Sequence, residues 1–261
     1  MKKIKHIILI GSGKGGVGKS TVAVNLSISL AKQSYKVGLL DADIYGPSIP
    51  KMMGIKEKPR LNNNKKLEPF FKYGIKFMSI GSLIPSEKPI IWRAPMVVNA
   101  LNQLLRDISW EDLDFLIIDL PPGTGDIQLT LSQNLQISGA IIVSTPQEVA
   151  LEDVRRAINM FKQVKIEIIG MVQNMSYFED SKKNKIYLLG ENNVVEEARK
   201  QNLNFLGEIP IVQDISFSSD QGKPISTNEK SEVALKFQEI VYSMKKVLAK
   251  QTNQETNIEI N

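Results

Sequence analysis

The chain has 261 residues, of which 42% are hydrophobic and 23% are charged, and this is the usage of an ordinary globular domain. It contains no cysteine, which excludes a disulfide framework and any thiolate metal site built from this chain alone. The net charge is +5, but the lysines are spread along the whole chain, whereas a nucleic-acid footprint should be clustered. We therefore expect no nucleic-acid partner.

The N-terminal residues resemble the start of a secretory signal only in their charge. The apolar run behind them covers just residues 7–10, whereas a signal needs about 7–15 apolar residues. A membrane-spanning helix needs about 18 such residues, and no segment reaches that length. We therefore expect a cytoplasmic protein with no membrane span.

Short apolar runs alternate with helical patterns along the chain. The run at residues 7–10 predicts a buried strand, and the four-residue spacing of Val22, Leu26 and Leu30 predicts a helix over 21–32. The elements expected after them, in chain order, are a strand at 37–40, a polar surface loop at 56–66, strands at 74–80, 115–118 and 140–144, a helix over 151–161, strands at 166–172 and 205–209, and a last helix capped by Ser231.

This alternation predicts one α/β domain over residues 1–250, followed by a polar and frayed tail at 251–261. The apolar runs lack polar alternation, so the strands should be buried on both faces. We expect a single doubly wound, mostly parallel sheet flanked by helices. Ligands bind such sheets at the carboxyl ends of the strands. Polar residues follow the predicted strands at 11–20, 41–48, 119–126 and 174, and we expect the site there.

The segment after the first predicted strand has the pattern of a phosphate-binding loop, G-x-x-x-x-G-K-[ST]. A buried strand leads into it and an amphipathic helix leads out, as this motif requires. The small residues leave backbone N–H groups free to surround an anion, and the helix adds the positive end of its dipole. Lys19 should reach the β- and γ-phosphates of ATP, and the Ser20 hydroxyl should ligate Mg²⁺. The residues expected to bind the nucleotide here are Gly13, Lys14, Gly15, Gly16, Val17, Gly18, Lys19, Ser20 and Thr21.

Lys14 is a second lysine inside this loop. It adds positive charge where negative charge develops on the γ-phosphate, which is the work of an arginine finger in other enzymes. Together with Lys19 it is a candidate catalytic residue. Spacing leaves open whether Lys14 serves its own nucleotide or that of a neighbouring subunit, and a solvated loop lysine is the alternative.

Two further strand ends carry carboxylates. Asp119 is followed by Leu-Pro-Pro-Gly-Thr-Gly-Asp; we expect it near the Mg²⁺ ion, with Gly123 in a flexible segment at the γ-phosphate. Asp41 and Asp43 end a neighbouring strand, and one of them should orient the attacking water. We favour Asp43 because it lies further toward the ligand. A helix cap or a turn is the alternative for this pair.

Three other features are weaker signals. Asn174 follows a later strand and is a candidate for contacting the adenine edge, although asparagine is common in turns. His6 is the only histidine and precedes the first strand, where a packed or exposed residue is expected rather than a ligand. The apolar stripe of the last helix is typical of a packed helix, and so we do not expect a membrane-surface element.

The segment GKGGVGKST at residues 13–21 resembles the deviant Walker A motif of the SIMIBI class, which includes MinD, ParA and nitrogenase iron protein. Within that class the chain most resembles the Mrp/ApbC group of iron–sulfur cluster carrier ATPases. The segments that carry this resemblance, in the expected order, are DADIYGPSIP at 41–50, WRAPM at 92–96, DFLIIDLPPGTGD at 114–126, NMSYF at 174–178 and GEIP at 207–210. The group usually has glycine where this chain has Ala94, a small difference.

The resemblance implies an Mg²⁺-dependent ATPase that binds and hydrolyses ATP as a homodimer. It implies that Lys14 reaches the nucleotide of the partner subunit, and that Asp43 supports hydrolysis from the first switch segment. It further implies that Asp119 is the Walker B acid, that Gly123 belongs to the second switch segment, and that Asn174 contacts adenine. The implied role is iron–sulfur cluster carriage or assembly, with iron–sulfur acceptor or scaffold proteins as partners.

One departure from the group concerns the cluster itself. Many members carry a Cys-x-x-Cys pair shortly after the NMSYF segment, and two subunits together hold a bridging cluster. Here residues 179–187 read EDSKKNKIY, and carboxylates and lysines are poor replacements for thiolates. The alternative function is therefore an ATP-gated switch, like ParA or MinD, that binds a protein, DNA or membrane cargo and no cluster.

Overall fold

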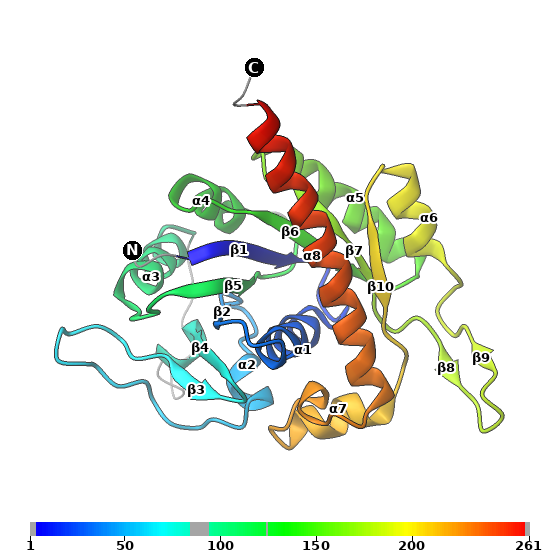
Figure 1. Ribbon diagram of the computed structural model, residues 1–261, viewed down its shortest axis with the longest axis horizontal. Coiled ribbons are helices and arrows are strands. Elements are labelled where there is room, and N and C mark those ends of the chain that lie inside the picture. Colours follow the sequence, from blue (N-terminus) through cyan, green and yellow to red (C-terminus); the bar gives the residue numbers. More distant parts are fainter. Residues whose placement is uncertain (1–3, 84–93, 124, 259–261) are drawn as a thin grey trace.

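The centre of the structure, a computed structural model that describes residues 4–83, 94–123 and 125–258, is an eight-stranded sheet (Figure 1). The strand order is β10-β7-β6-β1-β5-β2-β4-β3, and neighbouring strands are parallel except for β3 and β4. The strands are β1 (Ile4–Gly11), β2 (Val37–Asp41), β3 (Phe70–Lys72), β4 (Ile75–Ser79), β5 (Leu113–Asp119), β6 (Gly139–Ser144), β7 (Ile168–Gln173) and β10 (Phe205–Glu208). The doubly wound, mostly parallel sheet is thereby confirmed.

Helices cover both faces of this sheet, and Figure 1 shows α8 crossing one face beside α1. The helices on that face are α1 (Lys19–Lys32), α2 (Ile49–Met52) and α8 (Glu232–Ile258), and those on the other are α3 (Ala94–Asp107), α4 (Asp126–Asn134), α5 (Glu148–Gln163) and α6 (Asn193–Lys200). Within β1, Ile8 and Ile10 pack in the hydrophobic core under α1 and α8, whereas Ile7 and Leu9 pack in the core on the opposite face of the sheet. Successive residues of a strand face opposite sides, so burial on both sides explains the unbroken apolar runs.

Every predicted strand is present, and the differences lie at the strand ends. The strand expected at 74–80 begins one residue later, because Gly74 belongs to a turn. Tyr73 has φ 52° and Gly74 has φ 79°, and two residues of positive φ are typical of a tight hairpin. This turn joins β4 to β3, a short antiparallel edge strand that the sequence did not predict.

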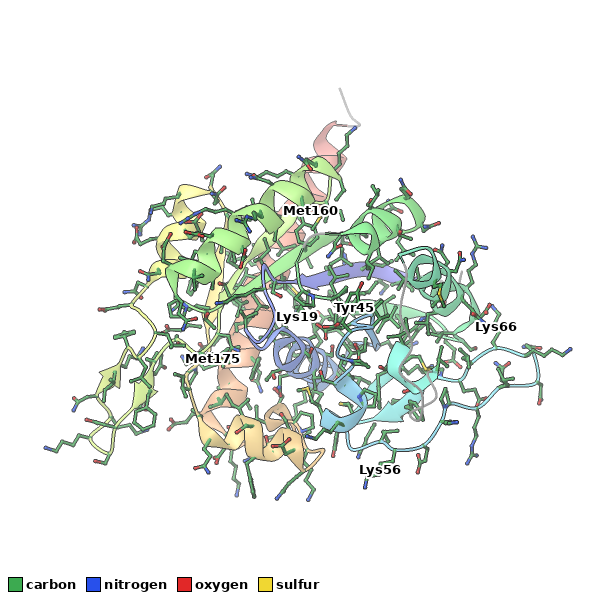
Figure 2. The ribbon with its side chains drawn as sticks, turned by 180° about the vertical axis from the view of Figure 1, so that it is seen from behind. Lys19, Tyr45, Lys56, Lys66, Met160 and Met175 are labelled. Atoms are coloured by element: carbon green, nitrogen blue, oxygen red, sulfur yellow. The ribbon has the colours of Figure 1, made fainter. Side chains whose placement is uncertain are left out.

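The predicted helices are also present, with longer boundaries. The helix expected over 21–32 begins at Lys19, and the one over 151–161 extends from Glu148 to Gln163. The Oγ atom of Ser231 accepts a hydrogen bond from the Ala234 N–H at 3.4 Å, which confirms the predicted cap. The helix α8 continues to Ile258, into the polar segment 251–261. Figure 2 shows Lys56 and Lys66 at the edge of the molecule, on the predicted surface loop.

Several elements were not predicted. They are the helices α2, α3, α4, α6 and α7 (Gln213–Asp220), the one-turn helices η1 (Ile80–Leu83) and η2 (Ile225–Thr227), and the hairpin of β8 (Phe178–Glu179) and β9 (Lys185–Ile186). Most are too short for a periodic pattern. In α3, by contrast, the spacing of Leu101, Leu104 and Leu105, all buried, was a usable signal. None of the helices that the structure describes is long and apolar enough to span a membrane.

The carboxyl ends of β1, β2 and β5 lie side by side. Ile10 of β1 and Asp41 of β2 both pair with Asp119 of β5, and Ser79 at the end of β4 pairs with Asp41. The sheet therefore brings together the segments after β1, β2 and β5, as the sequence predicted. Of the segments that carry the family resemblance, residues 92–93 and 124 lie outside the described residues.

Candidate functional site

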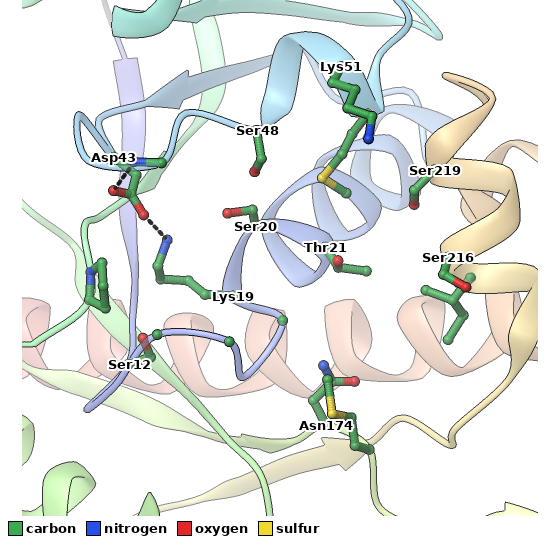
Figure 3. Close-up of a pocket in the computed structure, with 18 of the residues that line it drawn as sticks. Ser12, Lys19, Ser20, Thr21, Asp43, Ser48, Lys51, Asn174, Ser216 and Ser219 are labelled. Carbon is green, nitrogen blue, oxygen red and sulfur yellow. Dashed lines mark hydrogen bonds and ion pairs between the residues drawn. The ribbon is translucent and has the colours of Figure 1, made fainter. Parts of the chain in front are cut away.

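A cavity of about 830 Å³ opens at this carboxyl edge of the sheet (Figure 3). Its wall is formed by the loop and first turn at residues 12–21, by residues 43–52 after β2, and by residues 210–220, which include α7. Asn174 and Pro122 contribute to the wall between these segments. A cavity of this size suits a nucleotide-sized ligand.

The loop between β1 and α1 depends on its glycines. A Cβ atom on Gly13 would lie 2.3 Å from the backbone carbon of Asp153 on α5, so no larger residue fits there. Gly18 has φ 82° and directly precedes α1, and this left-handed conformation favours glycine. The N–H groups in the first turn of α1 lack partners within the helix. Together with the helix dipole, they favour an anion at this point.

Lys19, in the first turn of α1, contacts two carboxylates: Asp119, which ends β5, and Asp43, which lies two residues after β2. Its Nζ atom lies 2.8 Å from Oδ1 of Asp119 and 3.4 Å from Oδ2 of Asp43, the latter contact being drawn in Figure 3. Lys19 is 6% exposed and Asp119 is fully buried. Burial raises the pKa of the Asp119 carboxyl, and the Lys19 ammonium opposes this rise. Lys19 thus provides the positive charge that a buried carboxylate requires.

The second oxygen of Asp119, Oδ2, is buried and has no hydrogen-bond partner among the described residues. Such an oxygen usually binds a water or an ion. Ser20 follows Lys19 in the same turn and lines the cavity. Carboxylate and hydroxyl oxygens are hard ligands of the kind that Mg²⁺ prefers. The residues present therefore fit a magnesium ion at this end of the cavity.

Asp41 and Asp43 have different surroundings. Asp43 lines the cavity, and its Oδ1 accepts hydrogen bonds from the N–H groups of Tyr45 and Gly46, both at 3.3 Å. Asp41 is fully buried and does not line the cavity. Burial, assisted by the nearby charge of Asp119, raises the pKa of Asp41 to about 7. Asp43 is therefore the member of this pair that lines the cavity.

The other predicted residues take different positions around the loop. Lys14 lines the cavity and is partly exposed. Asn174 also lines it, and its Nδ2 donates a hydrogen bond to the Val17 carbonyl at 2.8 Å, so this residue supports the phosphate loop. Gly123 does not line the cavity, but its N–H donates to the Ser12 carbonyl at 3.1 Å and so links the segment after β5 to the phosphate loop.

The wall opposite the phosphate loop was missed at the sequence level. Ile215, Ser216 and Ser219 of α7 line it, and an ion pair of 3.1 Å joins Lys51 of α2 to Asp220 of α7. The helix α7 has no buried residue, so no apolar periodicity marks it. The signal that was available is position, because residues 211–220 follow the carboxyl end of β10.

A family model for NUBPL iron-transfer P-loop NTPases, within the ParA group, matches residues 3–245 of the chain. The chain belongs to this family. It is 49% identical over 254 residues to an iron-sulfur cluster carrier protein of Aquifex aeolicus, covering 96% of this chain and 70% of that protein.

Solved structures share the fold of this chain. A nucleotide-binding protein from Archaeoglobus fulgidus in complex with ADP is 42% identical, with a TM-score of 0.76 over 90% of this chain and 92% of the other. The cell division ATPase MinD of Pyrococcus furiosus shares the fold at 20% identity, with a TM-score of 0.68 over 94% and 100% of the two chains. The resemblance to iron–sulfur cluster carriers with a MinD- and ParA-like fold is confirmed.

The residues of this chain do not fit an iron–sulfur cluster. The chain has no cysteine, and the described residues include no group of three or more histidine, aspartate or glutamate side chains placed to hold a metal ion. In the β8–β9 hairpin, Asp180 accepts hydrogen bonds from the N–H groups of Lys182 and Asn184 and so holds the turn.

His6 stacks on Phe115 with 5.1 Å between ring centres, toward the end of β1 opposite the phosphate loop.

Proposed function

We propose that this protein is an Mg²⁺-dependent ATPase that works as a homodimer and serves iron–sulfur cluster carriage or assembly. The observation that carries the proposal is the buried cluster of Lys19, Asp43 and Asp119 beside the phosphate loop. The relatives support it, since one is named a cluster carrier and another is in complex with ADP. The chain brings no thiolate of its own, so the cluster is cargo whose ligands come from a partner protein.

ATP binding exchanges the partners of Lys19. The phosphates carry more negative charge than a single carboxylate, and the loop amides and helix dipole hold them beside the Lys19 ammonium. Lys19 then leaves Asp43, whose contact is the longer of the two at 3.4 Å. Asp119 and Ser20 would hold Mg²⁺, which neutralises phosphate charge when bound. Asp43, released from its ion pair on the cavity wall, accepts a hydrogen bond from the water that attacks the γ-phosphate.

Lys14 supports the homodimer. It lines the cavity and is partly exposed, so its ammonium is accessible to a second copy of the chain. A cation placed at the γ-phosphate stabilises the charge that develops there during hydrolysis. Two copies that face each other across their cavities each complete the site of the other, and hydrolysis releases them.

Phosphate release from ATP tests the activity. We expect turnover with Mg²⁺ that EDTA removes. The Lys14→Ala variant should bind ADP within about twofold of wild type but lose at least about tenfold in kcat, because the lysine acts on charge that develops during the reaction. Lys66→Ala, on the exposed loop, is the matched control and should retain wild-type kcat. Absence of Mg²⁺-dependent turnover in the wild type would refute the ATPase, and wild-type kcat in Lys14→Ala would remove its role.

The absence of cysteine favours a second candidate, an ATP-gated switch that binds a protein, DNA or membrane cargo and no cluster. Anaerobic reconstitution of the purified protein with iron and sulfide discriminates between the two. Little stable cluster is expected, because no thiolate is present. Stoichiometric iron with a cluster absorbance band would show that other ligands suffice. An ATP-dependent shift of DNA that weakens with salt would support the switch.

A further inference from the structure

Asp41 is a buried carboxylate that the nucleotide chemistry described above does not use. It ends β2, is fully buried, and lies outside the cavity wall. Both of its oxygens are nevertheless engaged. Oδ1 accepts a hydrogen bond from the Asp43 N–H at 3.1 Å, and Oδ2 accepts from the Ile49 N–H at 3.3 Å and from the Ser79 hydroxyl at 2.9 Å.

Through these contacts, the Asp41 side chain binds both ends of the segment 43–49. Asp43 is the first residue of this segment, and Ile49 begins α2 at its end. Ser79 links the same carboxylate to β4, and its Oγ also accepts a hydrogen bond from the Gly81 N–H at 3.0 Å. The position of Asp43 at the cavity therefore depends on a group anchored inside the sheet.

Accepting the N–H groups of Asp43 and Ile49 at two different oxygens requires a carboxyl group at position 41. A carboxyl group, ionised or protonated, can accept a hydrogen bond at each of its two oxygens, whereas an amide has one acceptor oxygen and an NH₂ group that can only donate. With asparagine at position 41, the NH₂ group would face either the Asp43 N–H or the Ile49 N–H, and one end of the segment would lose its partner. A buried N–H without a partner is unfavourable, so that end would move.

We propose that Asp41 is a positioning residue for hydrolysis. By binding both ends of segment 43–49, it holds the Asp43 side chain where that side chain can reach the water that attacks the γ-phosphate. The proposal rests on the proposed ATPase function for its kinetic consequence. The anchoring of the segment itself is independent of that function.

The test uses three variants of the full chain. Asp41→Asn removes one acceptor, Ser79→Ala removes the link to β4, and Ser27→Ala is the matched control. Ser27 is also fully buried, but its hydroxyl donates to the Ala23 carbonyl within α1. For each variant we would measure kcat, ADP affinity by calorimetry, and amide hydrogen exchange of a peptide covering residues 42–53 without nucleotide.

We expect Asp41→Asn to lower kcat at least about tenfold while ADP affinity stays within about threefold, since Asp43 acts on the attacking water and not on binding. Ser79→Ala should lower kcat about threefold, and Ser27→Ala should leave it unchanged. Exchange of peptide 42–53 should accelerate in the first two variants alone. Wild-type exchange in a folded Asp41→Asn overturns the proposal, and so does loss of ADP binding in proportion to kcat.

Ser79→Ala carries the test if Asp41→Asn does not fold, and wild-type exchange in Ser79→Ala then overturns the proposal. If wild-type protein shows no turnover, the ATPase function fails by itself, and the exchange of peptide 42–53 still decides whether Asp41 anchors the segment.

Discussion

Replacing Lys19 by methionine removes one positive charge and nearly preserves the length of the side chain. Lys19 is 6% exposed, and its ammonium lies 2.8 Å from the fully buried Asp119. Removing one member of a buried ion pair destabilises a protein by about 3–5 kcal/mol, because the remaining charge has no partner. Protonation of Asp119 reduces this loss, since the lysine no longer holds its pKa down. The destabilisation should therefore be larger at pH 8 than at pH 5.

The same substitution should weaken ATP binding. A hydrogen bond to a charged group contributes about 1.5–3 kcal/mol, and every 1.4 kcal/mol is a factor of ten in affinity. Loss of the Lys19 ammonium at the β- and γ-phosphates should thus reduce ATP affinity by about 10- to 150-fold.

Denaturant unfolding without nucleotide measures the first effect, and titration calorimetry with ATP and Mg²⁺ measures the second. Lys76→Ala is the matched control, because Lys76 forms a 2.6 Å ion pair with the exposed Glu111, and a surface pair contributes under about 1 kcal/mol. The reasoning is refuted if Lys19→Met is as stable as Lys76→Ala, or if it binds ATP with wild-type affinity.

Three further predictions concern the same region. Gly13→Ala should abolish ATP binding in calorimetry, because its Cβ would lie 2.3 Å from the Asp153 backbone; a variant that still binds would contradict the loop geometry. Asn174→Ala, which loses the bond to the Val17 carbonyl, should reduce ATP affinity about fivefold by calorimetry, at about 1 kcal/mol per hydrogen bond, and unchanged affinity would show that the bond is dispensable. Between pH 5 and 7 the free energy of unfolding should fall as pH rises, because the folded Asp41 has a pKa of about 7 against 3.8 unfolded and so binds more protons. This contribution reaches about 4 kcal/mol at most. In denaturant melts, the free energy of unfolding of Asp41→Asn should fall less steeply with pH than that of the wild type, and equal pH dependence would contradict this role of Asp41.

The strands were predictable because each one is buried on both faces. Residues 7–10 and 37–40 are apolar at every position, and the structure covers both sides of these strands with helices. The short elements were not predictable in this way. The helix α7 buries no residue, and β3 is defined by pairing with β4 across a turn at Tyr73. A three-residue strand is too short to show an alternating pattern in the sequence.

The candidate site was predictable in its parts but not in its contacts. The phosphate loop is local, so the spacing of Gly13, Gly18 and Lys19 carries its geometry. The partner of Lys19 is 100 residues away in sequence, at Asp119. Asn174 was predicted to contact adenine, and that contact stays a prediction; the structure adds its hydrogen bond to the loop.

The phosphate loop and the lack of thiolates follow from the amino-acid sequence alone, because a local motif and a composition need no knowledge of the fold. The packing of the fold places Asp43, just after β2, at the cavity wall, and it buries Asp41, the last residue of β2, inside the sheet. It also decided that α2 and α7 close the far wall. Such relations depend on strand order and packing, which bring together residues that are distant along the chain.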